Sequence, residues 1–140
     1  MSPEPLALLL LKASRWFDQQ LLERLEQQGW PRLTPAQSLV FAHLEPTGVP
    51  PATLARRLGT SRQATQDLVA GLVRHGLLEV VADPARHRGR LVTVTTTGRT
   101  LARDARAILT ELEKSIGAER ACALRDLLGD VGGGQPAHQT

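Results

Sequence analysis

The spacing of apolar residues near the start of the chain predicts a long helix from about Pro5 to Gln28, ended by Gly29. Apolar residues recur there at helical spacing: Leu6, Leu9, Leu10, Ala13, Trp16, Phe17, Leu21 and Leu25. Because Leu8 and Leu11 fill the other face, the first two turns are apolar nearly all round. Either a partner subunit or the protein's own core must cover such a surface.

Three shorter helices are predicted next. The first begins at Thr34-Pro35-Ala36-Gln37, a capping box with proline at the first helical position, and runs through Leu44 to end before Pro46. The second spans residues 52–58 and ends at Gly59. The third is capped by Thr60 or Ser61, runs to His75 and is closed by Gly76. Short helices in this order, with a brief break between the last two, form a helix-turn-helix.

Two β-rich runs follow, over residues 78–82 and 91–95, and the loop that joins them carries three arginines. A helix-turn-helix followed by a basic hairpin is the layout of a winged helix. Thr95, Thr96 or Thr97 can cap a long fifth helix, and a sixth helix follows Gly117. The predicted fold class is therefore mainly α with a small β-hairpin: a winged helix-turn-helix core flanked by N- and C-terminal dimerisation helices.

This pattern divides the 140-residue chain into four parts. Residues 1–32 hold the N-terminal helix, which belongs to the dimerisation region, and residues 33–98 form the winged helix-turn-helix lobe. Residues 99–131 supply the C-terminal dimerisation helices. Residues 132–140, which begin with three glycines, are predicted to be a flexible tail.

Charge is unevenly spread along the chain. Residues 51–103 contain nine basic and three acidic residues, a net charge of +6, whereas the remainder carries −3. A basic centre points to a polyanion, although a solvated arginine-rich surface would give the same count. Aromatic residues make up only 3% of the chain. Since single-strand and RNA modules stack bases on aromatic rings, duplex DNA is the favoured polyanion.

Other functional classes find little support. The apolar run at residues 6–11 is too short for a signal peptide or a membrane span, so a cytoplasmic protein without a membrane partner is expected. One cysteine and four scattered histidines offer neither a disulfide nor zinc-ligand spacing. No motif of a hydrolase, metalloprotease or nucleotide-binding loop occurs. We therefore predict no enzymatic activity and no cofactor.

Several short segments, in this order and spacing, resemble the MarR (multiple antibiotic resistance regulator) family of winged-helix transcription factors. They are Leu33–Gln37, Leu54–Gly59, Leu72–Leu77, the wing pairs Asp83-Pro84 and Arg88-Gly89, and Val94-Thr95 before Gly98-Arg99. The resemblance covers residues 33 to 100. It implies a homodimer that represses by occluding a promoter and that responds to a ligand.

The chain departs from this family at two places. Arg86 stands where members carry an aspartate in the wing, so Arg88 lacks its usual acid unless Asp83 substitutes for it. Gln66-Asp67 stands where members have Thr-Arg. An acid on a groove-facing helix repels phosphate, so Asp67 should either avoid the DNA backbone or accept a hydrogen bond from a cytosine amine.

On the predicted recognition helix, Ala64, Leu68 and Leu72 are expected to face the core. We expect direct base readout from the polar residues of its N-terminal part, and the alternative is that they are merely solvated. The predicted readers are Ser61, Arg62, Gln63, Thr65 and Gln66.

The wing and the lobe surface supply further basic candidates. For the wing at the minor groove these are Arg86, His87, Arg88 and Arg90. Candidate phosphate contacts are Arg56, Arg57, Arg74 and Arg99, some of which could instead be surface ion-pair partners. The predicted partners are double-stranded DNA and a second copy of the chain.

A small aromatic or phenolic effector is a further predicted partner, with Trp16, Trp30 and His43 as its candidate pocket. Packing of Trp16 and His43 and loop anchoring by Trp30 are the structural alternatives. Cys122 lies in an apolar-leaning helix, whereas a redox sensor needs an exposed thiol in electropositive surroundings. The competing functional hypothesis is a winged-helix adaptor that contacts proteins and does not bind DNA.

Overall fold

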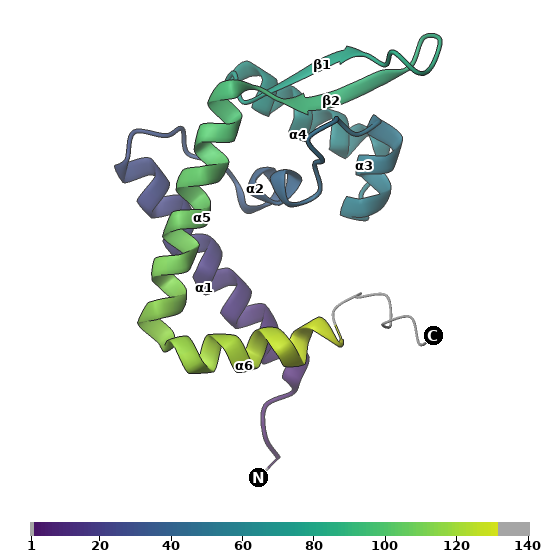
Figure 1. The fold of residues 1–140 in the computed structure, drawn as a ribbon. Helices are drawn as coiled ribbons and strands as arrows, with labels where there is room; N and C mark the ends of the chain where they lie inside the picture. Colours follow the sequence, from purple (N-terminus) through teal and green to yellow (C-terminus); the bar gives the residue numbers. More distant parts are fainter. Residues whose placement is uncertain (1, 132–140) are drawn as a thin grey trace. The chain divides into compact units, whose positions relative to one another are not determined.

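A computed structural model describes residues 2–131 (Figure 1). Its elements, in chain order, are α1 (Leu6–Gln27), α2 (Pro35–Ala42), α3 (Pro51–Leu58), α4 (Arg62–Arg74), β1 (Leu78–Ala82), β2 (Arg90–Val94), α5 (Thr96–Ile116) and α6 (Ala118–Gly129). The mainly helical fold with one antiparallel hairpin confirms the predicted fold class. The chain divides within α5 into two compact units, one ending at Ala105 and the other beginning at Arg106.

Side-chain caps hold the starts of α2 and α4, as predicted. Thr34 Oγ1 accepts from the amide nitrogen of Gln37 at 3.1 Å, and Gln37 Oε1 accepts from the amide nitrogen of Thr34 at 3.0 Å. This capping box occupies orphan amides at the start of α2. Ser61 rather than Thr60 caps α4, since its Oγ accepts from the amide nitrogen of Ala64 at 3.1 Å.

The end of α2 differs from the prediction. The helix stops at Ala42, and His43 is its C-cap rather than a mid-helix residue. Pro46 disfavours helical backbone at the residue before it, so the chain leaves the helix ahead of the turn. The Leu44 amide bonds the carbonyl of Phe41 three residues back, as in a tightened last turn.

The core of the first unit lies among α2, α3 and α4 and the adjoining strands. Val40, Leu54, Leu72, Leu77 and Leu78 are each at most 1% exposed. A methyl group at Gly71 of α4 would lie 2.7 Å from Nε2 of Gln37, so the lack of a side chain there admits the capping glutamine. The α2 cap and the packing of α4 are therefore linked.

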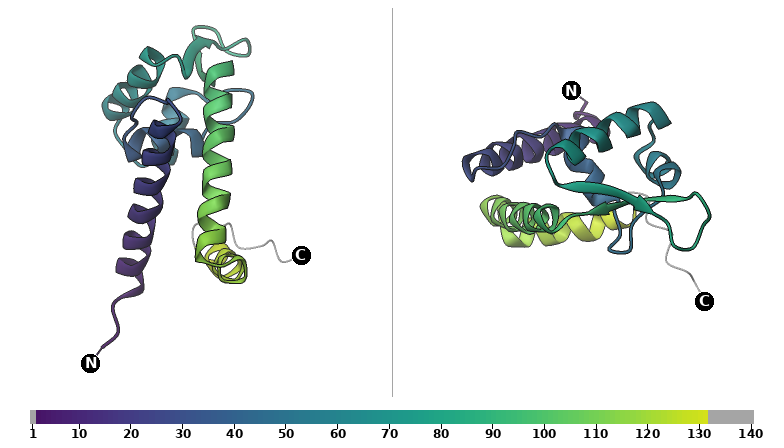
Figure 2. Two further views of the ribbon diagram at one scale, coloured as in Figure 1. Left: turned by 90° about the vertical axis from the view of Figure 1, so that its left-hand side faces the viewer. Right: turned by 90° about the horizontal axis from the view of Figure 1, so that it is seen from above.

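The hairpin is anchored at the middle of β2 by the segment before α3. β1 and β2 pair antiparallel, with Leu78 opposite Val94 and Ala82 opposite Arg90, so β2 starts one residue earlier than predicted. Val49 exchanges two backbone hydrogen bonds with Val92, of 3.0 and 2.8 Å. Figure 2 shows the hairpin projecting from the helices of this unit, with the loop at its outer end.

The exit from the hairpin is held by Thr95. Its hydroxyl donates to the carbonyl of Gly76 at 2.6 Å and accepts from the amide nitrogen of Gly98 at 3.0 Å. Thr95 is thus the cap of α5 among the three threonines considered. A Cβ at Gly98 would lie 2.1 Å from the carbonyl oxygen of Leu77, so a side chain at this position would force the start of α5 away from the segment that leads into β1.

The second unit contains the end of α5 and α6, joined at Gly117, whose φ of +110° suits glycine. Arg125 and Glu113 form an ion pair of 2.9 Å between the two helices. Most of α6 is exposed, including Leu124, Leu127 and Leu128.

Candidate nucleic-acid interface

The inward face of α4 is made by Thr65, Val69 and Leu72, which are 1%, 7% and 0% exposed. These positions recur at i, i+4 and i+7, one stripe of a helix. The predicted core face was offset from this stripe. Leu72 is buried as predicted, but Leu68 is only half-buried and Ala64 is exposed.

The prediction that Thr65 reads a base is therefore wrong. Its hydroxyl donates to the carbonyl of Ser61 at 2.9 Å and lies 2.8 Å from Oγ1 of Thr60. A threonine with a buried hydroxyl that bonds the preceding turn serves the helix-turn-helix itself. The true phase of the helix turns this side chain inward.

The other four predicted readers, Ser61, Arg62, Gln63 and Gln66, are exposed on the first turns of α4. The Ser61 hydroxyl oxygen is engaged as the helix cap. Gln63 Nε2 donates to Oδ1 of Asp67 at 3.0 Å, so these two neighbours are paired. Arg62 and Gln66 line a groove that separates α4 from the hairpin.

This groove has a volume of about 800 Å³ and an apolar lining that includes Val69, Val73, Val80 and Val92. We call it the wing groove. Five arginines surround it, namely Arg62, Arg74, Arg86, Arg88 and Arg90. None of the five forms an ion pair with another residue of the described range 2–131. The structure thus brings arginines of the recognition helix and the wing together around one hollow.

The tip of the wing is a compact turn. Asp83 Oδ1 accepts from the amide nitrogen of Ala85 at 2.9 Å, and the Asp83 amide nitrogen donates to the Gly89 carbonyl at 2.9 Å. Arg88 has a φ of +60°, in the left-handed region. Across the described chain no ion pair joins Asp83 to Arg88, so Asp83 supports the turn and does not replace the family's wing acid. Arg86, His87, Arg88 and Arg90 are all exposed.

The predicted phosphate contacts differ in their surroundings. Arg57 is held by Glu45, at 2.6 Å, and donates to the His43 carbonyl at 3.1 Å. Arg56, Arg74 and Arg99 are exposed, and Arg99 Nη1 lies 3.4 Å from the Val94 carbonyl. A phosphate contact by Arg57 would have to compete with its bonds to the loop after α2.

The three predicted effector residues have separate local roles. Trp30 Nε1 donates to Oδ2 of Asp104 at 2.8 Å, and Trp16 packs edge-on against Phe17 with ring centroids 5.0 Å apart. His43 caps the end of α2. None of the three lines the wing groove or the groove along α1.

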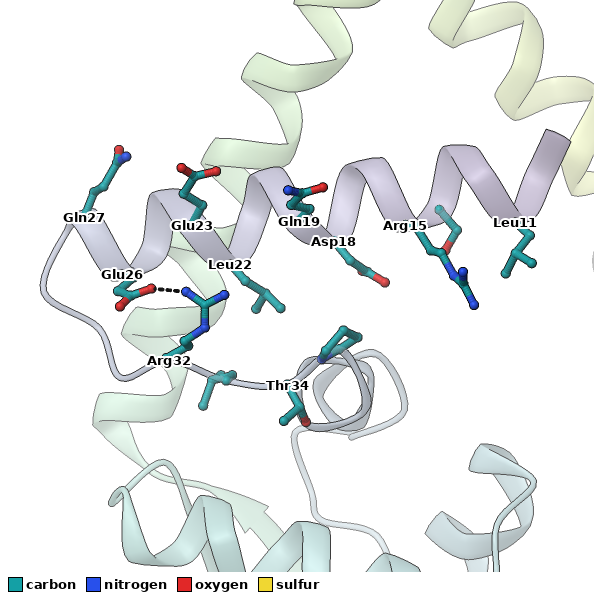
Figure 3. Close-up of a pocket in the computed structure, with 13 residues that line it drawn as sticks. Leu11, Arg15, Asp18, Gln19, Leu22, Glu23, Glu26, Gln27, Arg32 and Thr34 are labelled. Carbon is teal, nitrogen blue, oxygen red and sulfur yellow. Dashed lines mark hydrogen bonds and ion pairs between the residues drawn. The ribbon is translucent and has the colours of Figure 1, made fainter. Parts of the chain in front are cut away.

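The groove along α1 is larger, about 1340 Å³, and lies between this helix and the segment leading into α2. We call it the α1 groove. Figure 3 shows Asp18, Leu22 and Glu26 extending from α1 toward the segment that carries Arg32, which pairs with Glu26 at 2.7 Å. Burial raises the pKa of Asp18 above its ordinary value. This groove is not among the sites predicted from the sequence.

Cys122 is exposed on α6, contrary to the packing favoured by its apolar neighbours. Among residues 2–131 no group of three or more metal-ligating side chains comes together. No helix of the described chain has the length and apolar character to cross a membrane.

Residues 33–89, which span the helix-turn-helix, β1 and the loop that follows it, match the model of the MarR family. The reduced form of MarR from E. coli has the same fold, with a TM-score of 0.75 and 26% identity over 94% of this chain and 98% of that one. The chain thus shares its fold with MarR regulators, and its helix-turn-helix segment matches that family's model.

Two further MarR-type structures share the fold. A MarR-family transcriptional regulator from Rhodococcus sp. RHA1 gives a TM-score of 0.72 at 21% identity, over 96% of this chain and 100% of its own. CouR from Rhodococcus jostii RHA1, solved with p-coumaroyl-CoA, gives 0.69 at 24% identity, over 94% of each chain. A search of curated protein sequences finds no match. These likenesses show that the chain has the same fold as these proteins.

Proposed function

We propose that this protein, which has the fold of MarR regulators, binds double-stranded DNA with α4 in the major groove and the hairpin at the adjacent minor groove. The observation that carries the proposal is the set of five arginines around the wing groove without an ion-pair partner in residues 2–131. Exposed arginine is expected where a polyanion supplies the missing charge.

Base readout falls to the exposed first turns of α4. Arg62 suits guanine, whose O6 and N7 match a guanidinium, while Gln63 and Gln66 suit adenine. Ser61 remains a candidate through its exposed position. Arg86, His87, Arg88 and Arg90 serve the minor groove and nearby phosphates, and Arg56, Arg57, Arg74 and Arg99 fix the register through phosphates.

The protein acts as a homodimer in this proposal. In α1 every leucine from Leu8 to Leu11 is 37–47% exposed, and Leu6 is 63% exposed. Independently, α6 exposes Leu124, Leu127 and Leu128. Large apolar clusters that the chain leaves in water favour a partner of the same kind. Residues 1–32 and 99–131 then form the dimerisation region and residues 33–98 the DNA-binding lobe.

A two-fold dimer presents two α4 helices to half-sites about 34 Å apart, so the operator is a pseudo-palindrome. Binding there represses transcription in the cytoplasm by occluding a promoter. A small aromatic effector lowers DNA affinity by favouring a dimer that no longer fits successive grooves, which requires unequal affinity for the two states. The p-coumaroyl-CoA bound to CouR carries a phenolic acyl group of this general kind on a much larger coenzyme A.

Selection of bound duplexes from a library randomised at its centre tests these proposals together. We expect enrichment of an inverted repeat with half-site centres about one DNA turn apart. Enrichment of nothing above the starting library would overturn DNA recognition and would favour the protein-binding adaptor. In that case Arg62→Glu would change partner binding only.

A further inference from the structure

The hydrogen bond between Gln63 and Asp67 lies on the outward side of α4. The two residues are one turn apart, both are exposed, and Nε2 of Gln63 is 3.0 Å from Oδ1 of Asp67. Neither residue lines the wing groove, unlike Arg62 and Gln66. The pair therefore occupies its own stripe on the part of the helix that reaches base edges in this motif.

The chemistry of the two groups sets the orientation of the glutamine amide. A carboxylate can only accept hydrogen bonds, whereas an amide offers one acceptor oxygen and a nitrogen with two donors. The nitrogen of Gln63 must therefore face Asp67, and its Oε1 is turned away with one N–H still unused. The amide of a glutamine without such a partner could rotate to turn either its oxygen or its nitrogen toward a base. The hydrogen bond to Asp67 fixes one of these two orientations.

We propose that Asp67 is a positioning residue that makes Gln63 select a base bearing an exocyclic amine, adenine above all, at one position of each half-site. In the major groove adenine presents an amine and the acceptor N7, and cytosine presents an amine. Guanine and thymine present only acceptors at their polar edges there. The oriented Oε1 accepts from the amine, and the remaining N–H donates to N7 of adenine.

This inference rests on the proposed DNA binding and specifies which atom of Gln63 meets the base. The negative charge of Asp67 has a second, separate effect, because it repels the phosphates of every duplex alike. Affinity for a single duplex therefore mixes the two effects. The ratio of affinities between bases at one position isolates the positioning effect, since uniform repulsion cancels from the ratio.

The experiment uses the full chain and the duplex selected by the wild-type protein, with each half-site position replaced in turn by the other three bases. We expect the wild type to prefer adenine at one position by about tenfold over guanine or thymine. Asp67→Ala and Gln63→Ala should each lose this preference, and the double variant should lose no more than either single one. Glu79→Gln removes one negative charge from β1 and should keep the preference.

Thermal unfolding of each variant checks that these exposed substitutions leave the fold intact. If Asp67→Ala keeps the adenine preference while Gln63→Ala loses it, Asp67 does not position the amide. If both keep it, Gln63 does not read that base. Either result overturns the inference alone, whereas a wild type that selects no duplex overturns the proposed DNA binding itself.

Discussion

The two grooves of the first unit differ in how their positive charge is balanced. In the α1 groove Arg32 pairs with Glu26, and Asp18 and Glu23 contribute further acids. In the wing groove all five arginines lack an ion-pair partner among residues 2–131. An arginine that is paired with a carboxylate of the same chain attracts an anionic ligand only weakly, whereas a cluster of unpaired arginines attracts a polyanion. Of the two grooves, the wing groove is therefore the better suited to a polyanion.

Charge reversal should separate the grooves most strongly. Arg62→Glu in the wing groove should weaken binding to the selected duplex on the order of a hundredfold, because it replaces a base contact with a repulsive charge. Arg32→Glu makes the same charge change in the α1 groove and should alter affinity by no more than about threefold. Fluorescence anisotropy with labelled duplex measures both. Equal losses would show that the grooves do not differ in function.

Neutralisation gives a smaller and more specific effect. Arg88→Ala should lower the slope of log affinity against log salt concentration by about 1, since one phosphate neutralisation is lost. Arg15→Ala removes a charge that lines the α1 groove and should leave the slope unchanged. Titrations over a range of salt concentrations provide the slopes. An unchanged slope for Arg88→Ala would remove this residue from the interface.

The α1 groove should matter for stability instead. Thr34→Ala deletes half of the capping box and should lower the free energy of unfolding by about 1 kcal/mol in urea titrations. Affinity of the folded protein for DNA should stay the same. Thr47→Ala, at an exposed turn residue, is the matched control and should be neutral. If Thr34→Ala weakened DNA binding under conditions where the variant is fully folded, Thr34 would not act on stability alone.

Asp18 should give the smallest change. Burial raises its pKa above 3.8, so the fold disfavours the ionised form and loses stability as the pH rises through the raised value. Asp18→Asn removes that penalty and should raise stability at neutral pH by less than about 0.5 kcal/mol. The gain should vanish below pH 3.8. Thermal melts of Asp18→Asn across a range of pH measure this gain, with Glu23→Gln as the control. A gain in stability that persists in acid would show that the raised pKa of Asp18 is not its cause.

Local chemistry in the sequence determined most of the fold. The Thr34 capping box, the stop at Gly59 and the β-rich composition of the two strands each act within a few residues, so they can be recognised without tertiary contacts. The same holds for the concentration of arginine in residues 51–103. The order of these segments was enough to indicate the family.

Tertiary structure decided the phase of α4 and the partners of its charged residues. Thr65 and Ala64 are adjacent and both suit a helix, and only packing against the neighbouring helices turned Thr65 inward. Arg57 and Arg62 are likewise two arginines of neighbouring short helices that the sequence does not distinguish. In the fold, Glu45 forms an ion pair with Arg57, whereas Arg62 has no ion pair within residues 2–131. A rotation of about 100° per residue separates core from surface on a helix, so a one-residue difference in phase changes which side chains can meet DNA.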